Sequence, residues 1–267
     1  MKKFMALLLV AGMTLSLTAC GGSTDTAKKD QADGEDTFTV GFDQDFPPFG
    51  YVGDDGEFTG FDIEMATECA ARMGKKIVLQ PIDWDAKDME LEAGTIDCIW
   101  NGFTMNGRED QYTWTDPYMD NSQVVVVKKD SGINTLADLA GKVVEVQKES
   151  AAETALNDEE HADLTASFAQ LLSVGEYNTA FMDLESGAVD AVAIDIGVAQ
   201  FQIEGKEDQY QILDETISSE QYAVGFFLGN TALRDEVQST LSEMVEDGTF
   251  AEISNKYFGY DVCTLGK

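Results

Sequence analysis

Two stretches of this sequence are near copies of each other, and they constrain the fold more than any other feature does. MELEAGTIDCIWNG covers residues 89–102 and MDLESGAVDAVAID covers residues 182–195, an offset of 93 positions. Both copies contain Met, an acid, Leu, Glu, a small residue, Gly, a variable residue, a β-branched residue and Asp, followed by an apolar run. The repetition predicts two lobes built from the same kind of α/β unit.

Each copy predicts a helix, a turn and a buried strand. The helix should present Met and Leu to a core and end at Gly94 or Gly187, because glycine supplies the left-handed position after a helix. Asp97 and Asp190 start the strands, where Asp usually accepts hydrogen bonds from nearby backbone N–H groups, and we favour that role over a catalytic one. Ligands of open α/β sheets lie beyond the carboxyl ends of strands, so each copy should point a strand end at a shared cleft.

The first twenty residues predict a secretory signal peptide. Lys2 and Lys3 precede an uncharged, mostly apolar segment, residues 4–19, which is too short to span a membrane convincingly. Leu-Thr-Ala before Cys20 resembles a bacterial lipobox, which implies that Cys20 is the lipidated mature N-terminus, anchored to the outer face of the cell membrane. The alternative is an ordinary secretory signal with an incidental cysteine. Residues 21–37, polar apart from alanines, predict a flexible tether.

Acidic residues greatly outnumber basic ones. The whole chain has 50 acidic and 17 basic residues, and without Lys2 and Lys3 the balance is 15 against 50, a net charge of −35. This charge excludes a sequence-independent nucleic-acid binder, which needs a basic face. We interpret the acidity as the solubility of an exposed surface, and we expect a monomer.

Cysteine and histidine are too few to predict metal or nucleophilic chemistry. Cys69, Cys98 and Cys263 match no metal-binding spacing, and the first two either form a disulfide or are separate buried thiols. The single histidine, His161, stands in the acidic stretch NDEEHADL and should lie on the surface. We therefore expect no metal site, no cofactor and no Ser-His-Asp triad.

Strand and helix patterns alternate along the chain, which predicts an α/β protein with mostly parallel strands. The predicted strands are residues 38–42, 75–80, 96–100, 124–128, 143–147, 189–194 and 222–228, with a hairpin over 51–61 that turns at 54–56. The predicted helices are residues 62–74, 85–94, 135–142, 150–158, 176–187, 195–205 and 231–248.

Seven pieces of the sequence match a known family in their order and spacing. They are VGFDQDFPPFGY, GEFTGFDIEMA, NGFTMNGRED, WTDPY, LADLAGKVVEVQ, GAVDAVAID and EDGTFAEISNKYFG. Over residues 38–260 the chain resembles the bacterial extracellular solute-binding proteins of family 3, the polar amino acid-binding lipoproteins of ABC importers. The resemblance implies the two-lobed type II periplasmic-binding-protein fold, called a Venus flytrap, with two hinge crossovers.

The resemblance also implies where the lobes begin and end. Lobe 1 should contain residues 36–119 and 223–267, and lobe 2 should contain residues 120–222. The hinges should lie near residues 119–122 and 219–222. A free polar amino acid should bind between the lobes, and closure should deliver it to the ABC permease in the membrane.

A free amino acid is a zwitterion, so its site needs a partner for each charge. Arginine suits the carboxylate, because its guanidinium is a planar and permanently charged fork. The resemblance assigns this role to Arg108, with Thr104 and Gly102 adding hydroxyl and backbone contacts. This chain has one residue fewer than the family between Thr104 and Arg108, and Gly107 could tighten the loop. The alternative is a surface Arg108 paired with Glu109 or Asp110.

The resemblance places Asp195 against the ligand ammonium, although Asp195 could instead cap the helix that follows it. Backbone N–H groups at Ser150 and Ala151 should face the carboxylate. The family commonly has Gly before Ser150, whereas this chain has Glu149, which brings an acid near an anion site.

The remaining predicted site residues line the pocket for the ligand side chain. Phe46 and Phe49 flank a rigid Pro pair and either wall the ligand or pack in the core. Asp43 and Trp84 match lining positions in similar proteins, and Asp43 could pair with a basic side chain. Asn101, at the end of the first repeat, and Gln147 complete the predicted ligand-binding set.

We therefore predict an extracytoplasmic amino-acid-binding lipoprotein that serves an ABC importer and is not an enzyme. Two alternatives remain. One is a periplasmic cyclohexadienyl or arogenate dehydratase on the same fold, which the sequence disfavours because no poised His or nucleophile is evident. The other is a sensor subunit that reports its ligand to a receptor.

Overall fold

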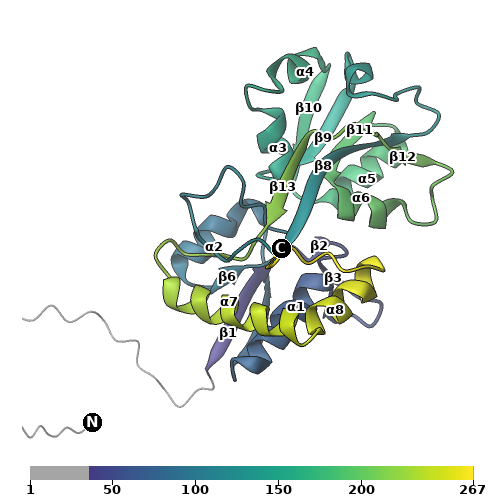
Figure 1. Ribbon diagram of the computed structural model, residues 1–267. Coiled ribbons are helices and arrows are strands. Elements are labelled where there is room, and N and C mark those ends of the chain that lie inside the picture. Colours follow the sequence, from purple (N-terminus) through teal and green to yellow (C-terminus); the bar gives the residue numbers. More distant parts are fainter. Residues whose placement is uncertain (1–35, 267) are drawn as a thin grey trace, which may run out of the picture. The chain divides into compact units, whose positions relative to one another are not determined.

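The computed structural model describes residues 36–266, and a five-stranded sheet forms the first of its two lobes (Figure 1). Its strand order is β5 (Lys76–Pro81), β1 (Thr37–Phe42), β6 (Cys98–Ile99), β14 (Gly225–Phe226) and β7 (Thr113–Trp114). β1 runs parallel to both of its neighbours, whereas β14 is antiparallel to β6 and β7. The chain therefore leaves this lobe after β7 and returns to its sheet with β14.

Helices and a small second sheet complete lobe 1. The helices are α1 (Phe61–Arg72), the 3-10 turn η1 (Trp84–Ala86), α2 (Lys87–Ala93), α7 (Thr231–Glu246) and α8 (Thr249–Phe258). The small sheet consists of β2 (Asp45–Phe46), β3 (Gly50–Val52) and β4 (Phe58–Thr59). β3 and β4 pair antiparallel, which confirms the predicted hairpin.

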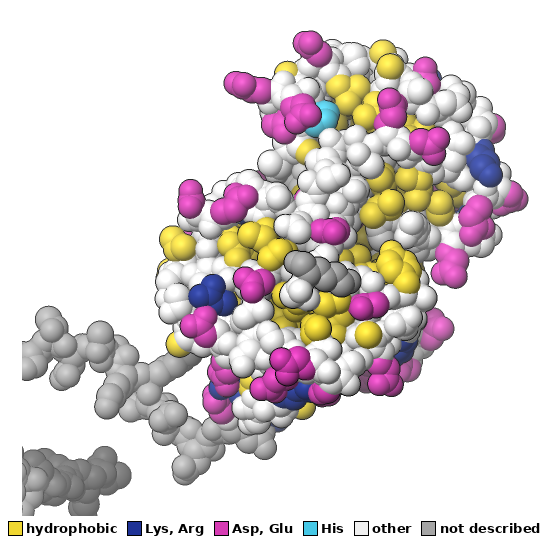
Figure 2. Space-filling model, in the orientation of Figure 1, with side chains coloured by type: hydrophobic (Ala, Val, Ile, Leu, Met, Phe, Trp, Pro, Cys, Tyr) yellow, Lys and Arg dark blue, Asp and Glu magenta, His cyan; other side chains and the backbone are white. Residues whose placement is uncertain are grey.

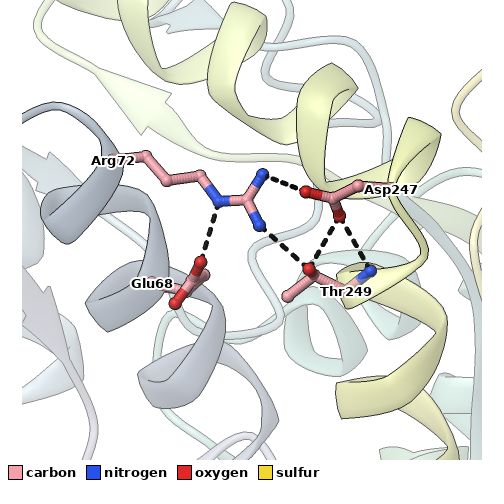
Figure 3. A network of polar contacts seen from close by, with 4 residues as sticks. All are labelled: Glu68, Arg72, Asp247 and Thr249. Atoms are coloured by element: carbon pink, nitrogen blue, oxygen red, sulfur yellow. Dashed lines mark hydrogen bonds and ion pairs between the residues drawn. The ribbon is translucent and has the colours of Figure 1, made fainter.

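A polar network holds α1 against the junction of α7 and α8 (Figure 3). The Arg72 guanidinium donates to Glu68 Oε1 at 2.8 Å, to Asp247 Oδ2 at 2.7 Å and to Thr249 Oγ1 at 2.9 Å. Hydrogen bonds from Arg72 and Thr249 lower the pKa of Asp247 to about 2. One arginine thus ties the C-terminal helices to the first helix of the lobe.

The second lobe contains a mixed sheet with helices on both faces (Figure 1). Its strand order is β10 (Gln170–Val174), β9 (Val143–Gln147), β11 (Ala191–Asp195), β8 (Met119–Lys128) and β12 (Tyr210–Ile212), and β13 (Ser218–Tyr222) also pairs with β8. Its helices are η2 (Leu136–Leu139), α3 (Ala151–Leu156), α4 (Ala162–Ser167), α5 (Tyr177–Ser186) and α6 (Ile196–Ile203). The α/β prediction with two lobes is confirmed, but the prediction of mostly parallel strands is wrong, because seven of the eleven strand pairings in the described residues are antiparallel.

Two paired strands carry the chain between the lobes. β8 and β13 are antiparallel, and Met119 pairs with Tyr222 while Ser122 pairs with Ser219. These are the segments that the sequence predicted as crossovers. The C-terminal segment returns to the same place, because Cys263 bridges Met119. The predicted lobe limits and the hinge motion itself remain predictions.

The repeated motif folds in the same way in both lobes. Gly94 and Gly187 end their helices with φ of 68° and 81°, as predicted. Asp97 Oδ2 accepts from Thr39 N at 2.7 Å, and Asp190 Oδ2 accepts from Val143 N at 2.8 Å. The predicted structural role of both acids is therefore confirmed, since each one joins the start of its strand to the start of the neighbouring strand.

The prediction that the two methionines of the repeat face a core is wrong. Leu91 and Leu184 are buried, but Met89 is 65% exposed and Met182 is 61% exposed. On these short amphipathic helices the leucine alone fills the space above the sheet, so the methionine two residues earlier points to solvent.

Cys69 and Cys98 are separate buried thiols, which settles the alternative of a disulfide between them. His161 lies at the surface as predicted, with its side chain partly buried, and its Nδ1 lies 3.2 Å from Asp158 Oδ1. Acidic side chains are spread over the face drawn in Figure 2, where Lys and Arg are few.

Within residues 36–266 no helix has the length and apolarity needed to cross a membrane. The predicted signal peptide, Cys20 and nearly all of the tether lie outside the described residues.

Candidate functional site

A pocket of about 300 Å³ lies between the two lobes, at the lower end of the range for small-molecule sites. It brings together eleven of the twelve predicted ligand-binding residues. They are Asp43, Phe46, Trp84, Asn101, Gly102, Thr104, Arg108, Gln147, Ser150, Ala151 and Asp195. Phe49 is the exception, because it is fully buried and packs edge-on against Tyr222 and Phe61 in the core.

Arg108 forms one wall, and the short loop before it is tightened as the sequence suggested. Gly107 has φ of 77°, and Arg108 N donates to Met105 O at 2.9 Å, which closes a turn that requires a positive φ at its third residue. The guanidinium donates to Thr104 O at 3.1 Å and lies 5.5 Å from the Phe103 ring. Among the described residues no acid forms an ion pair with Arg108, so its charge is available to a carboxylate.

The first turn of α3 lies opposite Arg108. Ser150 caps this helix by accepting from Glu153 N at 3.1 Å, and Ala151, the first helical residue, has a backbone N–H with no acceptor inside the helix. Glu149 is exposed and adopts a left-handed φ of 60°. It presents its carbonyl oxygen to Arg108 Nη2 at 3.3 Å, and its side chain does not line the pocket.

Asp195 ends β11 and lies on the pocket wall. It occupies the cap position of α6, but its side chain makes no capping hydrogen bond. Instead Oδ1 accepts from Asn121 Nδ2 at 2.7 Å, from Gln123 Nε2 at 2.6 Å and from Tyr222 Oη at 2.5 Å. Burial, together with the nearby Glu220 charge, raises the pKa of Asp195 above its ordinary value. No Lys, Arg or His in residues 36–266 contacts this carboxylate, so it can receive an ammonium group.

A third acid, Asp43, lies in another part of the pocket. Its Oδ1 accepts from Asp45 N at 2.8 Å, and its Oδ2 accepts from Gln147 Nε2 at 2.6 Å. Asn101 Oδ1 accepts from Asp43 N at 2.8 Å, while Asn101 Nδ2 is buried without a partner in the described structure. Burial raises the pKa of Asp43 to about 6. This part of the pocket therefore offers a carboxylate and an amide donor to a polar side chain.

Aromatic rings close the remaining sides. Phe46 lies 6.0 Å from the Tyr177 ring, and Trp84 packs edge-on against Phe103 at 5.5 Å. Lys87 is buried beside this wall, with Nζ 5.4 Å from the centre of the Trp84 ring. These rings give the pocket apolar walls on those sides, and polar interactions are stronger where such walls displace water.

The pattern of residues 38–260 matches the model of one family, the bacterial extracellular solute-binding proteins, family 3. This chain belongs to that family. The match includes every residue that lines the pocket, so the site is part of the family's shared domain.

Similar family members are amino-acid-binding proteins. The L-cystine-binding protein TcyJ of Escherichia coli K12 is 31% identical over 97% of this chain and 94% of its own length. Among solved structures, an ABC uptake transporter substrate-binding protein of Streptococcus pneumoniae with bound histidine is 35% identical, with a TM-score of 0.81 over 85% of this chain and 94% of that one. AncCDT-1, an ancestral amino acid-binding protein and precursor of cyclohexadienyl dehydratase, is 28% identical, with a TM-score of 0.75 over 83% of this chain and 95% of that one.

The structure of this family member adds one buried acid that sequence reasoning missed. Asp62, fully buried at the start of α1, accepts from Gly102 N at 2.6 Å and from Tyr118 Oη at 2.9 Å. Burial raises the pKa of Asp62 to about 7. Position 102 suits glycine, because its φ is 54° and a Cβ there would lie 3.0 Å from Phe46 Cε1. The acid lay within the matched piece GEFTGFDIEMA, where we interpreted it only as part of a helix.

The two crossing strands supply further site residues that the sequence did not predict. Asn121, Gln123, Glu220 and Tyr222 surround the Asp195 carboxylate, and all four are buried. The sequence marked their segments as hinges, but nothing in the local pattern connected them with the pocket.

Proposed function

We propose that this protein captures a free polar α-amino acid outside the cytoplasm and delivers it to an ABC importer. One observation carries the proposal: within residues 36–266, the guanidinium in this small pocket has no carboxylate partner and the buried carboxylate has no cationic partner. Arg108 would bind the ligand carboxylate, and Asp195 would bind its ammonium group. A zwitterion satisfies both groups at once, whereas a neutral solute would leave two charges desolvated and unpaired.

The side-chain part of the pocket favours a polar ligand. Asp43 and Asn101 offer an acceptor and a donor, and Phe46 and Trp84 provide flat surfaces around them. The ligands named for TcyJ and for the Streptococcus pneumoniae protein, cystine and histidine, are both amino acids with polar side chains.

The family is extracellular, and we propose that Cys20 carries a lipid that holds this member at the outer face of the membrane. Mass spectrometry of the mature N-terminus tests this, because a diacylglyceryl group adds a large and defined mass.

We further propose that the protein binds its ligand without transforming it. The residues that line the pocket include no His, Cys, Lys or Tyr to act as an acid, base or nucleophile at neutral pH. Asp43 is a carboxylic acid with a raised pKa, so the dehydratase alternative needs a direct assay. Turnover of prephenate or arogenate by the purified domain would contradict a role in binding alone.

A ligand screen and one substitution test the main proposal. Thermal shift against the twenty amino acids, cystine and ornithine should identify a ligand, because binding to the folded state raises the melting temperature. We expect Arg108→Ala to weaken the binding of that ligand by roughly 2–5 kcal/mol, because the ligand carboxylate is left unpaired in the closed cleft. Calorimetry measures this change.

Arg72→Ala is the matched control, because it removes an arginine that lies in the network of Figure 3. It should lower stability and leave affinity unchanged. Equal affinities of wild type and Arg108→Ala would contradict the assignment of Arg108.

A further inference from the structure

Two buried carboxylates share the same pair of amide donors where the lobes meet. Asn121 Nδ2 donates to Asp195 Oδ1 and to Glu220 Oε1, each at 2.7 Å. Gln123 Nε2 donates to the same two oxygens, at 2.6 Å and 2.8 Å. Thr104 Oγ1 also donates to Glu220 Oε1 at 2.7 Å. An amide nitrogen has two hydrogens, so both amides are fully used in joining the two acids.

The cluster formed by Asp195, Glu220, Asn121 and Gln123 has more hydrogen-bond acceptors than donors. Asp195 and Glu220 are 4% and 7% exposed, and neither is in contact with a cation among residues 36–266. The carbonyl oxygens of Asn121 and Gln123 are buried there as well, without a hydrogen-bond donor in the described structure. Two ionised carboxylates so close together and so little solvated repel each other strongly. The cluster therefore needs one positive charge, which a proton or a cation can supply.

The other ionisable groups nearby do not supply that charge. Tyr177 from α5 and Tyr222 from β13 face the pair, and burial raises the pKa of both phenols well above its ordinary value. Arg108 donates instead to Thr104 O and Glu149 O. Asp195 lines the pocket and Glu220 does not, so a cation can reach the pair only from the Asp195 side.

We propose that Glu220 is the second carboxylate of the ammonium site and that the Asp195–Glu220 pair holds one proton, which it exchanges for the ammonium group of the ligand. The proposal rests on the proposed function for the identity of the cation. In the free protein one of the two acids carries the proton, and the amides of Asn121 and Gln123 join it to the other. When the ammonium group binds Asp195, the proton leaves to solvent and the net charge of the cluster is unchanged.

The exchange makes capture depend on pH. Because binding releases a proton, affinity must fall as pH falls below the apparent pKa of the pair. The network also joins the ligand to the crossing strands, since Glu220 lies on β13 and Asn121 and Gln123 lie on β8. An acidic surrounding would therefore favour ligand release through the same residues that connect the lobes.

The first test examines the free protein and needs no ligand. The carboxyl carbons of Asp and Glu are labelled with ¹³C, and their chemical shifts are followed from about pH 4 to pH 8. We expect one carboxyl of the pair to stay protonated until near neutral pH. Glu220→Gln should move the Asp195 transition down by about one pH unit or more, because the neighbouring charge is gone. Two acids that are both ionised at pH 6 would overturn the proposal.

The second test counts protons during binding. Calorimetry with L-arginine and with L-cystine, in two buffers of different ionisation enthalpy near pH 6, should show nearly one proton released per ligand in the wild type. Affinity should fall about tenfold for each pH unit below the apparent pKa of the pair. In Glu220→Gln the release should be clearly smaller than in the wild type, and the pH dependence should shift to lower pH.

Glu145→Gln is the matched control, because Glu145 is a buried glutamate on β9 that makes no contact with Asp195. It should keep the wild-type proton count. If Glu220 has a purely structural role, Glu220→Gln will lower thermal stability and leave proton release unchanged. That result would overturn the proposal. If no amino acid of the thermal-shift screen binds the wild type, the proposed ligand class fails, and the titration of the free protein still decides whether the pair shares a proton.

Discussion

Glu149 has a left-handed backbone conformation that residues with a Cβ rarely adopt. Its φ of 60° makes it the one non-glycine residue with positive φ in the described part of the chain. A Cβ in this left-handed region lies too close to the backbone, which costs roughly 1–2 kcal/mol. The conformation persists because it aims the Glu149 carbonyl at Arg108 and its N–H at Glu153 Oε2. Local strain thus supports the wall of the candidate site.

We expect Glu149→Gly to raise the free energy of unfolding by about 1 kcal/mol, because glycine adopts this φ without the steric penalty. Urea denaturation of the free domain measures the change. Glu149→Ala is the control, since it removes the same carboxylate but keeps a Cβ. If Ala stabilises as much as Gly, the gain comes from charge and the backbone argument is wrong.

At the scale of elements, the repeated helix–turn–strand unit makes a paired prediction. Asp97→Ala and Asp190→Ala should each lower the free energy of unfolding by about 1–3 kcal/mol, because each leaves a partly buried backbone N–H without its charged acceptor. The double variant should be additive, since the two hydrogen bonds lie in different sheets. Urea denaturation measures both.

The corresponding Asp→Asn variants keep an acceptor oxygen and should retain much of the stability. Ligand affinity should stay at the wild-type level in all of these variants. A loss of affinity without a loss of stability would give the two acids a direct role in the site and contradict the structural one.

The elements that the sequence predicted are those with a strong local pattern. Helix α1, the hairpin and both repeats have clear periodicity and glycine stops. Several elements were missed, and for three of them the physical reason is plain. β10 is a partly exposed edge strand, α4 has only six residues, and β13 reads SSEQY, with too little apolar content to suggest a strand. β13 is polar because it crosses between the lobes and carries Glu220 into a buried network.

The same distinction separates the predicted site residues from the missed ones. Asn101, Gly102 and Asp195 end the buried strands of the two repeats, so the general rule for α/β sheets places them at the cleft. Asn121, Gln123 and Glu220 come together only through contacts between residues more than 70 positions apart. No local pattern encodes such contacts, and the polar letters alone suggest ordinary surface.

At the scale of the whole described domain, a few polar contacts join the lobes across the pocket. Gln147 Nε2 donates to Asp43 Oδ2 at 2.6 Å, and Lys148 Nζ lies 2.7 Å from Asp85 Oδ2. Exposed ion pairs of the second kind contribute little and are screened by salt. A ligand that binds Arg108 on one lobe and Asp195 on the other would add the stronger link, so it should shift the balance toward the closed form.

The buried acids also determine how the stability of the free domain depends on pH. Burial raises the pKa of Asp43 to about 6 and of Asp62 to about 7, and it raises that of Asp195 in the same direction. A carboxyl whose folded pKa is raised stabilises the fold while it is protonated, and this contribution is lost as pH rises through the folded pKa. We therefore expect the free energy of unfolding to fall by roughly 2–4 kcal/mol between pH 5.5 and pH 8.

Urea denaturation of the ligand-free domain at several pH values measures this trend, and a stability that rises from pH 5.5 to pH 8 would contradict it. Glu220→Gln should make the slope shallower, because Asp195 then ionises at lower pH without a charged neighbour. Ligand affinity should depend on pH in the opposite way and rise with pH, because an ammonium group binds best when the pair has lost its proton. Acid would then make the empty domain more stable and the complex weaker, because a proton and the ligand ammonium compete for the same two carboxylates.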